Sequence, residues 1–233
     1  CSFCASGKKG WKKDLSISEI VEQVVKIDAE LKKRGERVTH VVFMGMGEPL
    51  DNYDAVKGAI DALVDPKRVG LSSRRVTVST VGVLPGIEKL REEGLKISLV
   101  LSLHAPSQKL RERIIPYAKK YPVEKVLNAM ERYREETGRD VTYEYILIAG
   151  VNDSVEHALE LVSLLEGKRG SVNLIPYNPV EGLKWNRPSK EAVNAFRGVL
   201  MKEGIVTTQR YTKGVDIAAA CGQLALIEGE KVL

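Results

Sequence analysis

Short apolar runs alternate along the chain with longer segments in which apolar residues recur at helical spacing. The runs predict six β-strands, over residues 41–43, 76–79, 97–102, 141–148, 172–175 and 205–208. Most of the runs are continuous in apolar residues, which is typical of parallel strands that are buried on both faces. The pattern therefore predicts a β-sheet that is covered by helices.

Helical spacing predicts eight helices before, between and after these strands. The first begins at a serine cap, Ser16 or Ser18, and stops near Gly35. The others are expected over residues 53–63, 84–93, 108–115, 123–137, 154–165, 189–203 and 215–227. Strand followed by helix, repeated in one chain, implies a parallel α/β sheet, either a barrel or an open doubly wound sheet.

Polar or glycine-rich clusters follow five successive predicted strands. They occupy residues 44–49, 79–82, 102–106, 150–153 and 176–179. In a parallel barrel these carboxyl ends share the face on which active sites are built. A Rossmann fold would instead have one glycine-rich turn, directly after its first strand. The sequence therefore predicts a partial (β/α) barrel with parallel strands and outer helices, as one domain over residues 1–233.

Composition is that of an ordinary globular protein, with 43% hydrophobic and 29% charged residues. The 36 basic and 31 acidic side chains give a net charge of +5, which permits a polyanionic partner without requiring one. A solvated surface is the simpler explanation for either basic cluster, at 8–13 or 32–37, taken alone. No apolar run approaches the roughly 18–20 residues of a membrane span, and the first residues do not have the charged-then-apolar pattern of a signal peptide. We expect a cytoplasmic protein without membrane contact.

Three cysteines are present, and an odd number argues against a disulfide framework. Cys1 and Cys4 form a C-x-x-C motif, whose thiolates could hold a soft metal centre. Half of a zinc site and a thioredoxin-like redox pair remain open alternatives. Because the chain begins on cysteine rather than methionine, we expect it to be a fragment.

Three other residues could act in a functional site, but each also has a simpler structural explanation. Glu48 stands at a strand end beside Gly45 and Gly47, where it could receive an ammonium group or belong to a plain turn. His104, taken alone, is better explained as a structural histidine. Cys221, taken alone, is better explained as a small buried hydrophobe.

Seven motifs together carry a resemblance. They occupy residues 1–7, 43–49, 78–80, 102–106, 150–153, 173–179 and 216–224. In this order they resemble the radical S-adenosylmethionine (SAM) adenine methyltransferases of the RlmN/Cfr family, with closer similarity to the RlmN branch. The resemblance implies methyl transfer to adenine C2 in 23S rRNA and in some tRNAs. The alternatives are C8 methylation of the Cfr type, a radical SAM enzyme acting on a small molecule, and a non-catalytic RNA-binding barrel.

The resemblance also implies roles for single residues. Cys1 and Cys4 match two of the three ligands of a [4Fe–4S] cluster, and Cys221 matches the cysteine that carries the methyl group. The SAM pocket is implied to comprise Gly47, Glu48, Ser79, Ser102, Leu103, His104 and Asn178. An electron donor such as flavodoxin and a monomeric state are expected with these roles.

Some parts of the family pattern are not matched. The first cluster cysteine, the cysteine that resolves Cys221 and a helical accessory domain are all expected upstream of residue 1. The stretch 210–215 has fewer arginines than is usual in the family. We therefore expect the 233-residue chain alone to bind the cluster poorly, to recognise RNA weakly and not to turn over.

Overall fold

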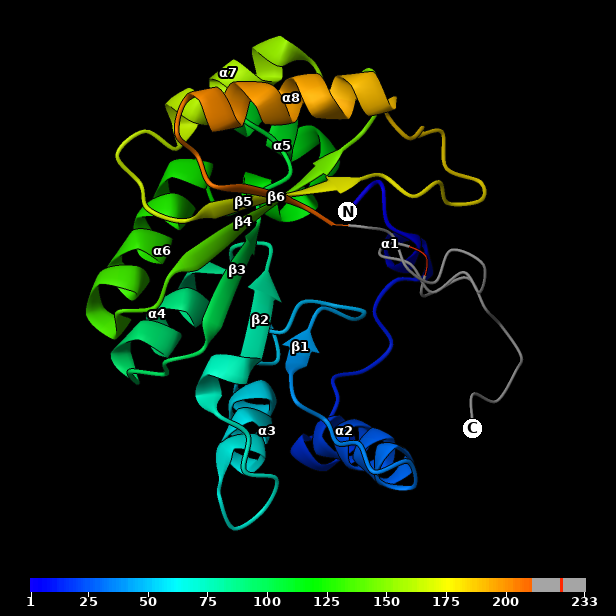
Figure 1. The fold of residues 1–233 in the computed structure, drawn as a ribbon, viewed down its shortest axis with the longest axis vertical. Helices are drawn as coiled ribbons and strands as arrows, with labels where there is room; N and C mark the ends of the chain where they lie inside the picture. The colour runs from blue at the N-terminus through cyan, green and yellow to red at the C-terminus, as the bar shows by residue number, and fades with distance from the viewer. Residues whose placement is uncertain (211–222, 224–233) are drawn as a thin grey trace.

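The computed structural model describes residues 1–210 and Gln223. Within them, six parallel strands form one sheet in the order β1-β2-β3-β4-β5-β6, so each strand pairs with the next along the chain (Figure 1). The strands are β1 Val41–Phe43, β2 Val76–Thr80, β3 Ser98–Ser102, β4 Val141–Leu147, β5 Ser171–Pro176 and β6 Thr207–Gln209. This open, parallel arrangement confirms the predicted partial barrel.

Helices connect successive strands on the outer side of the sheet (Figure 1). The α-helices are α1 Ala5–Lys9, α2 Ile17–Lys32, α3 Tyr53–Val64, α4 Leu84–Glu92, α5 Gln108–Ile114, α6 Val123–Thr137, α7 Val155–Leu164 and α8 Lys190–Lys202; two 3-10 turns are η1 Ser73–Arg75 and η2 Pro116–Lys119. Seven predicted helices are confirmed, while α1 was not predicted. The eighth, over 215–227, lies outside the described residues. Of the helices that the structure describes, none is long and apolar enough to cross a membrane.

The main core lies between the outer face of the sheet and the helices. Strand residues such as Leu99, Leu101 and Tyr145 point to this side and are fully buried against helices such as α6. Burying one such side chain contributes about 1.5–3 kcal/mol. Helix α6 ends where Gly138 adopts φ 67°, a left-handed conformation that favours glycine and stops the helix before β4.

The opposite, concave face of the sheet is more polar than the apolar runs indicated. Register places Ser102 beside Glu144, Glu144 beside Asn173 and Asn173 beside Thr208, in one row across four strands. Because side chains in a strand alternate between faces, this row is opposite the apolar residues of the main core. The expectation of strands apolar on both faces is therefore wrong for this row, which lines the inside of the partial barrel.

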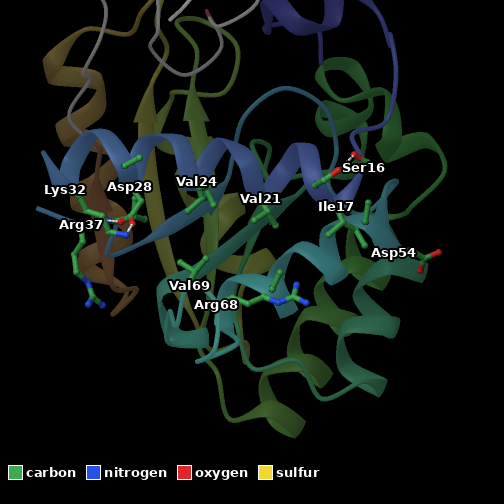
Figure 2. Close-up of a pocket in the computed structure, with 16 residues that line it drawn as sticks. Ser16, Ile17, Val21, Val24, Asp28, Lys32, Arg37, Asp54, Arg68 and Val69 are labelled. Carbon is green, nitrogen blue, oxygen red and sulfur yellow. Dashed lines mark hydrogen bonds and ion pairs between the residues drawn. The ribbon is translucent and has the colours of Figure 1, made fainter.

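A groove of about 1110 Å³ separates α2 from the α3 region on the outer side of the molecule (Figure 2). Helix α2 starts with a capping box, in which Ser16 and Glu19 bond each other's backbone N–H, and none of its residues is buried. Ile17 packs directly on α3, where a Cβ at Gly58 would lie 2.5 Å from the Ile17 Cδ1. None of the predicted site residues lines this groove.

Candidate functional site

The predicted SAM-pocket residues lie at or just beyond the carboxyl ends of the strands. Glu48 follows β1, Ser79 and Ser102 lie at the ends of β2 and β3, and Asn178 follows β5. The Ser79 and Ser102 hydroxyl oxygens are 3.2 Å apart. The parallel sheet thus gathers residues that are up to 130 positions apart in sequence at one edge, as the barrel prediction required.

Glu48 is a carboxylate held by backbone donors. Its Oε1 accepts a hydrogen bond from the Leu50 N–H at 3.1 Å, and its Oε2 accepts one from the Val81 N–H at 2.8 Å. Burial raises the pKa of Glu48 to about 7, although these bonds favour the ionised form. The structure shows no ion pair to Glu48 among the residues that it describes. A fixed, partly desolvated carboxylate of this kind is a receptor for a cationic group.

The glycine before Glu48 is required by the backbone. Gly47 has φ 95°, a region that residues with a Cβ rarely adopt. Apart from their chain neighbours, no atom of the described residues lies within 4 Å of the position of a Cβ at Gly45 or Gly47, so none of these residues covers the loop backbone. This arrangement allows a ligand to approach the main chain closely beside the Glu48 carboxylate.

His104 is held in an unusual conformation by polar contacts. It has φ 59°, the one positive φ outside glycine among the described residues. Its Nδ1 accepts a hydrogen bond from the Ile146 N–H at 3.1 Å, and its ring lies edge-on to Phe3, with centroids 5.3 Å apart. Burial lowers the pKa of His104 to about 3, so the ring is neutral. The Nδ1 of the imidazole therefore has a structural role. A ligand in the predicted SAM pocket would contact the His104 backbone or the Nε2 of its ring.

Leu103 and Asn178 flank the same edge. The Leu103 side chain is fully buried in the main core, and its N–H already donates to the Leu101 and Glu144 carbonyls, so this residue can offer a ligand only its carbonyl oxygen. Asn178 is also buried, and its Oδ1 accepts a hydrogen bond from the Arg187 Nη1 at 2.9 Å. Arg187 therefore orients the amide at the end of β5.

The Cys1–Cys4 turn packs next to this edge of the sheet. The Cys4 N–H donates to the Cys1 carbonyl at 3.3 Å, and the Ser2 N–H donates to the Ile114 carbonyl at the end of α5 at 2.9 Å. Both thiols are free and partly exposed. A Cβ at Gly7 would lie 2.7 Å from the Cys1 carbonyl oxygen, so only glycine fits there without a shift. Through Phe3 on His104, the turn is tied to the predicted SAM pocket.

The donor set of the turn fits one side of an iron–sulfur cluster. Two thiolates in one turn suit iron, but the described residues contain no group of three His, Cys, Asp or Glu side chains that could hold a metal ion. Cys1 and Cys4 can thus supply two ligands and no more. Cys221 lies outside the described residues.

Two buried residues missed by the sequence prediction hold the pocket together. The Asn152 Nδ2 donates to the His104 carbonyl at 2.8 Å and to the Ile146 carbonyl at 2.6 Å, while its Oδ1 accepts from the Ile148 N–H at 2.7 Å. Its place in the Gly-Val-Asn-Asp motif was the only sequence signal. Asn152 fixes the strained His104 loop against the end of β4.

Arg111 is the second such residue. It is fully buried on α5, and its guanidinium donates to the carbonyls of Leu103 at 3.1 Å, Val81 at 2.5 Å and Ser102 at 3.3 Å. Burial lowers the pKa of Arg111 to about 10, which still leaves it charged at neutral pH. Its contacts hold the ends of β2 and β3 together, and nothing in the sequence around 111 distinguished it from a surface arginine.

Glu144 and Arg210 form an ion pair across the concave face. The Arg210 Nη2 lies 3.4 Å from the Glu144 Oε1 and 3.5 Å from the Met44 sulfur, so it connects β6, β4 and the loop after β1. Burial raises the pKa of Glu144, while Arg210, Asn173 and Ser79 oppose that shift. This pair was not predicted, because its members are 66 positions apart.

Comparison with known families identifies the chain. The sequence pattern of the radical SAM superfamily matches residues 1–162. The chain belongs to the radical SAM superfamily. Members of this superfamily use a [4Fe–4S] cluster and SAM, which agrees with the paired cysteines and the isolated Glu48 carboxylate at the strand ends.

Within this radical SAM family, the predicted similarity to RlmN is confirmed. The chain is 56% identical over 230 residues to a probable dual-specificity RNA methyltransferase RlmN 2 of Protochlamydia amoebophila, covering 99% of this chain and 64% of that protein. It is 49% identical to a probable dual-specificity RNA methyltransferase RlmN of Desulforudis audaxviator, covering 96% of this chain and 70% of that protein.

A solved structure agrees with these relatives. The crystal structure of a radical SAM methyltransferase from Sphaerobacter thermophilus superposes with a TM-score of 0.93 at 45% identity, covering 96% of this chain and 65% of that chain. The radical SAM chain thus spans just under two thirds of this structure and of the Protochlamydia relative.

Proposed function

We propose that this radical SAM domain, residues 1–233, is the catalytic core of an RNA methyltransferase that methylates C2 of an adenine in 23S rRNA and in some tRNAs. The proposal is supported by relatives at 49–56% identity that are named dual-specificity RNA methyltransferases. It implies a protein that works as a monomer in the cytoplasm and receives electrons from a donor such as flavodoxin.

The observation that carries the SAM part of the proposal is the Glu48 carboxylate. It is fixed by two backbone N–H groups and has no ion pair among the described residues, so it suits the ammonium group of SAM. The Ser79 and Ser102 hydroxyls and the backbone of Gly47 and Leu103 would contribute further polar contacts. His104 and Asn178 complete the pocket from β3 and β5.

The three cysteines have two roles in this proposal, cluster binding and methyl transfer. Cys1 and Cys4 would hold one side of the [4Fe–4S] cluster next to this pocket, in a turn anchored to α5. When bound, the cluster and SAM supply the one-electron chemistry that an unreactive aromatic carbon requires. The Cys221 thiolate would attack the methyl carbon of one SAM, with S-adenosylhomocysteine as the leaving group, and would carry the methyl group to the adenine. The neutral, buried His104 and the apolar Phe3 pack against each other on the inner side of the turn, while the two thiols remain partly exposed.

Mass spectrometry of the full-length protein tests this function. Anaerobically reconstituted protein, incubated with SAM, a reductant and a 23S rRNA fragment, should yield 2-methyladenosine in the digested RNA. Cys221→Ala should abolish the product while keeping SAM affinity within about twofold. Methylation at C8 would place the protein in the Cfr branch, and modification of a small molecule with no RNA product would reject the proposal.

A further inference from the structure

The positive charge of this chain is concentrated in two short segments. Residues 32–37 and 65–75 contain eight basic and two acidic side chains, so together they carry a net charge of +6, against +5 for the whole chain. The rest of the sequence is therefore close to neutral. Such a concentration differs from the even mixture of charges on an ordinary solvated surface.

The fold brings these two segments together at one end of the sheet. Arg37 lies just before β1 and η1 leads directly into β2, while register pairs Val41 with Val76 at the start of both strands. The segments therefore meet at the amino ends of β1 and β2, opposite the carboxyl ends that carry Glu48 and Ser79. Strand β1 is also an edge of the sheet, so this end borders the open side of the partial barrel.

Arginines from both segments surround one cavity. A cavity of about 470 Å³ is lined by Arg37, Arg74 and Arg75 together with residues 70–72. Arg37 also lines the neighbouring α2 groove, near Lys32 and Asp28 at one end of it (Figure 2). We call Arg37, Arg74 and Arg75 the arginine cluster.

Among the described residues, no member of the arginine cluster forms a close ion pair, although Asp28, which pairs with Lys32, also attracts Arg37 at longer range. Lys32, Lys33 and Arg68 lie within ion-pair distance of acidic neighbours at 2.7, 2.7 and 3.5 Å. By contrast, all three members of the cluster are exposed, and among the described residues none has a carboxylate within 4.0 Å. Three guanidinium groups around one cavity repel each other, so an anion bound there would be stabilised by all of them.

We propose that the arginine cluster binds the phosphodiester backbone of the RNA substrate, as a contact remote from the methylated adenine. This inference rests on the proposed function. Guanidinium groups bind phosphate through paired N–H donors, and such contacts position a nucleic acid without reading its sequence. The three residues of β1 span only about 10 Å between the cluster and the Glu48 loop. One folded RNA can therefore reach both ends of the strand by crossing the open edge.

The test measures RNA affinity of the full-length protein at several salt concentrations, with a fluorescently labelled tRNA as the probe. In the triple variant Arg37→Gln, Arg74→Gln, Arg75→Gln we expect about a tenfold to hundredfold loss of affinity at low salt. The slope of log affinity against log salt should fall by about 2–3, because up to three phosphate contacts are lost. SAM affinity and thermal midpoint should remain at the wild-type values.

A charge-matched control is the variant Lys119→Gln, Lys125→Gln, Lys202→Gln, which removes three exposed lysines from other surfaces. In this control, the slope of log affinity against log salt should stay within about one of the wild-type value. In a second variant, Arg37→Lys, Arg74→Lys, Arg75→Lys, the positive charges are kept, so most of the slope lost in the glutamine variant should return. A wild-type slope in the arginine variant would overturn the inference while leaving the methyltransferase function intact. Absence of RNA binding by the wild-type protein would overturn both. Loss of binding to an acidic protein, with RNA affinity unchanged, would assign the surface to a protein partner instead.

Discussion

Glu48 combines two properties that oppose each other in the free protein. Its position among backbone donors favours the carboxylate, but burial dominates and raises its pKa to about 7. An ammonium ligand would reverse this balance, because an adjacent opposite charge lowers the pKa of a carboxyl group. Ligand binding and proton release at Glu48 should therefore be coupled.

Calorimetric titration can detect this coupling. Affinity for SAM should rise about tenfold between pH 5.5 and 7, as the fraction of ionised Glu48 increases. Glu48→Gln should weaken binding by about tenfold to a hundredfold at pH 7 and should show no such rise. Glu203→Gln, which changes an exposed carboxylate at the end of α8, is the control and should match wild type. An unchanged pH profile in Glu48→Gln would remove Glu48 from the SAM site.

Without ligand, the same residue should lower stability as pH increases. The folded state binds the Glu48 proton more tightly than the unfolded state, since its pKa is raised from 4.5 to about 7. The contribution of Glu48 to the free energy of unfolding is therefore highest below pH 4.5, and it falls as the pH rises to about 7. Urea denaturation of wild type and Glu48→Gln across this range should converge at low pH and diverge above it.

Asn152 shows how one side chain supports several backbone groups. Its amide satisfies two carbonyls and one N–H within a fully buried region, so its loss leaves all three without partners. Asn152→Ala should reduce the free energy of unfolding by about 2–4 kcal/mol in urea denaturation. Asn128→Ala, which loses an exposed contact with Lys168, should cost less than about 0.5 kcal/mol. Equal losses in the two variants would contradict this role.

At the level of strands and helices, the hydrophobic pattern predicted most of the fold. Six strands and seven helices form where short apolar runs and helical spacing predicted them. The reason is that burial between the sheet and the helices determines the spacing of apolar residues in both kinds of element. The clusters after the strands lie together at one edge of the sheet, and the assignment of a SAM site to that edge stays a prediction. What the pattern could not show are pairings across the fold, such as Arg111 with the ends of β2 and β3, since these depend on three-dimensional proximity.

The packing of α4 on the loop after β1 offers a test between elements. A Cβ at Gly86 in α4 would lie 2.6 Å from the Leu50 Cβ, a contact that no rotamer change can relieve. Leu50 donates its N–H to Glu48, so displacement of this loop should alter the predicted SAM pocket. Gly86→Ala should therefore lower the free energy of unfolding by about 1–3 kcal/mol and weaken SAM binding severalfold.

Gly198 in α8 provides the matched control. No atom of the residues that the structure describes, other than the helix's own backbone and the chain neighbours, lies within 4 Å of a Cβ at this position, so Gly198→Ala gains helix propensity without a clash with them. We expect it to increase the free energy of unfolding by about 0.5–1 kcal/mol and to leave SAM affinity unchanged. If Gly86→Ala behaves in the same way, the close approach of α4 to Leu50 does not position Glu48.

The molecule as a whole is an open sheet whose two edge strands, β1 and β6, do not pair with each other. Arg210 spans the concave face between them, with its backbone N–H on the Leu174 carbonyl at 2.9 Å and its guanidinium between Glu144 and Met44. The pair thus connects the loop that leads to Glu48 with the end of β6. Its contribution should depend on whether Glu144 is ionised.

A double-mutant cycle at two pH values measures that contribution. Arg210→Gln leaves the buried Glu144 carboxylate without its cation, so the pKa of Glu144 should rise further and the folded state should lose more stability as pH increases. At pH 8 we expect a coupling energy of about 1–2 kcal/mol between Arg210→Gln and Glu144→Gln from urea denaturation. At pH 5 the coupling should be smaller, because Glu144 carries a proton in a larger fraction of the folded molecules. Equal coupling at both values would show that the pair acts through packing of the two side chains, and not through charge across the open sheet.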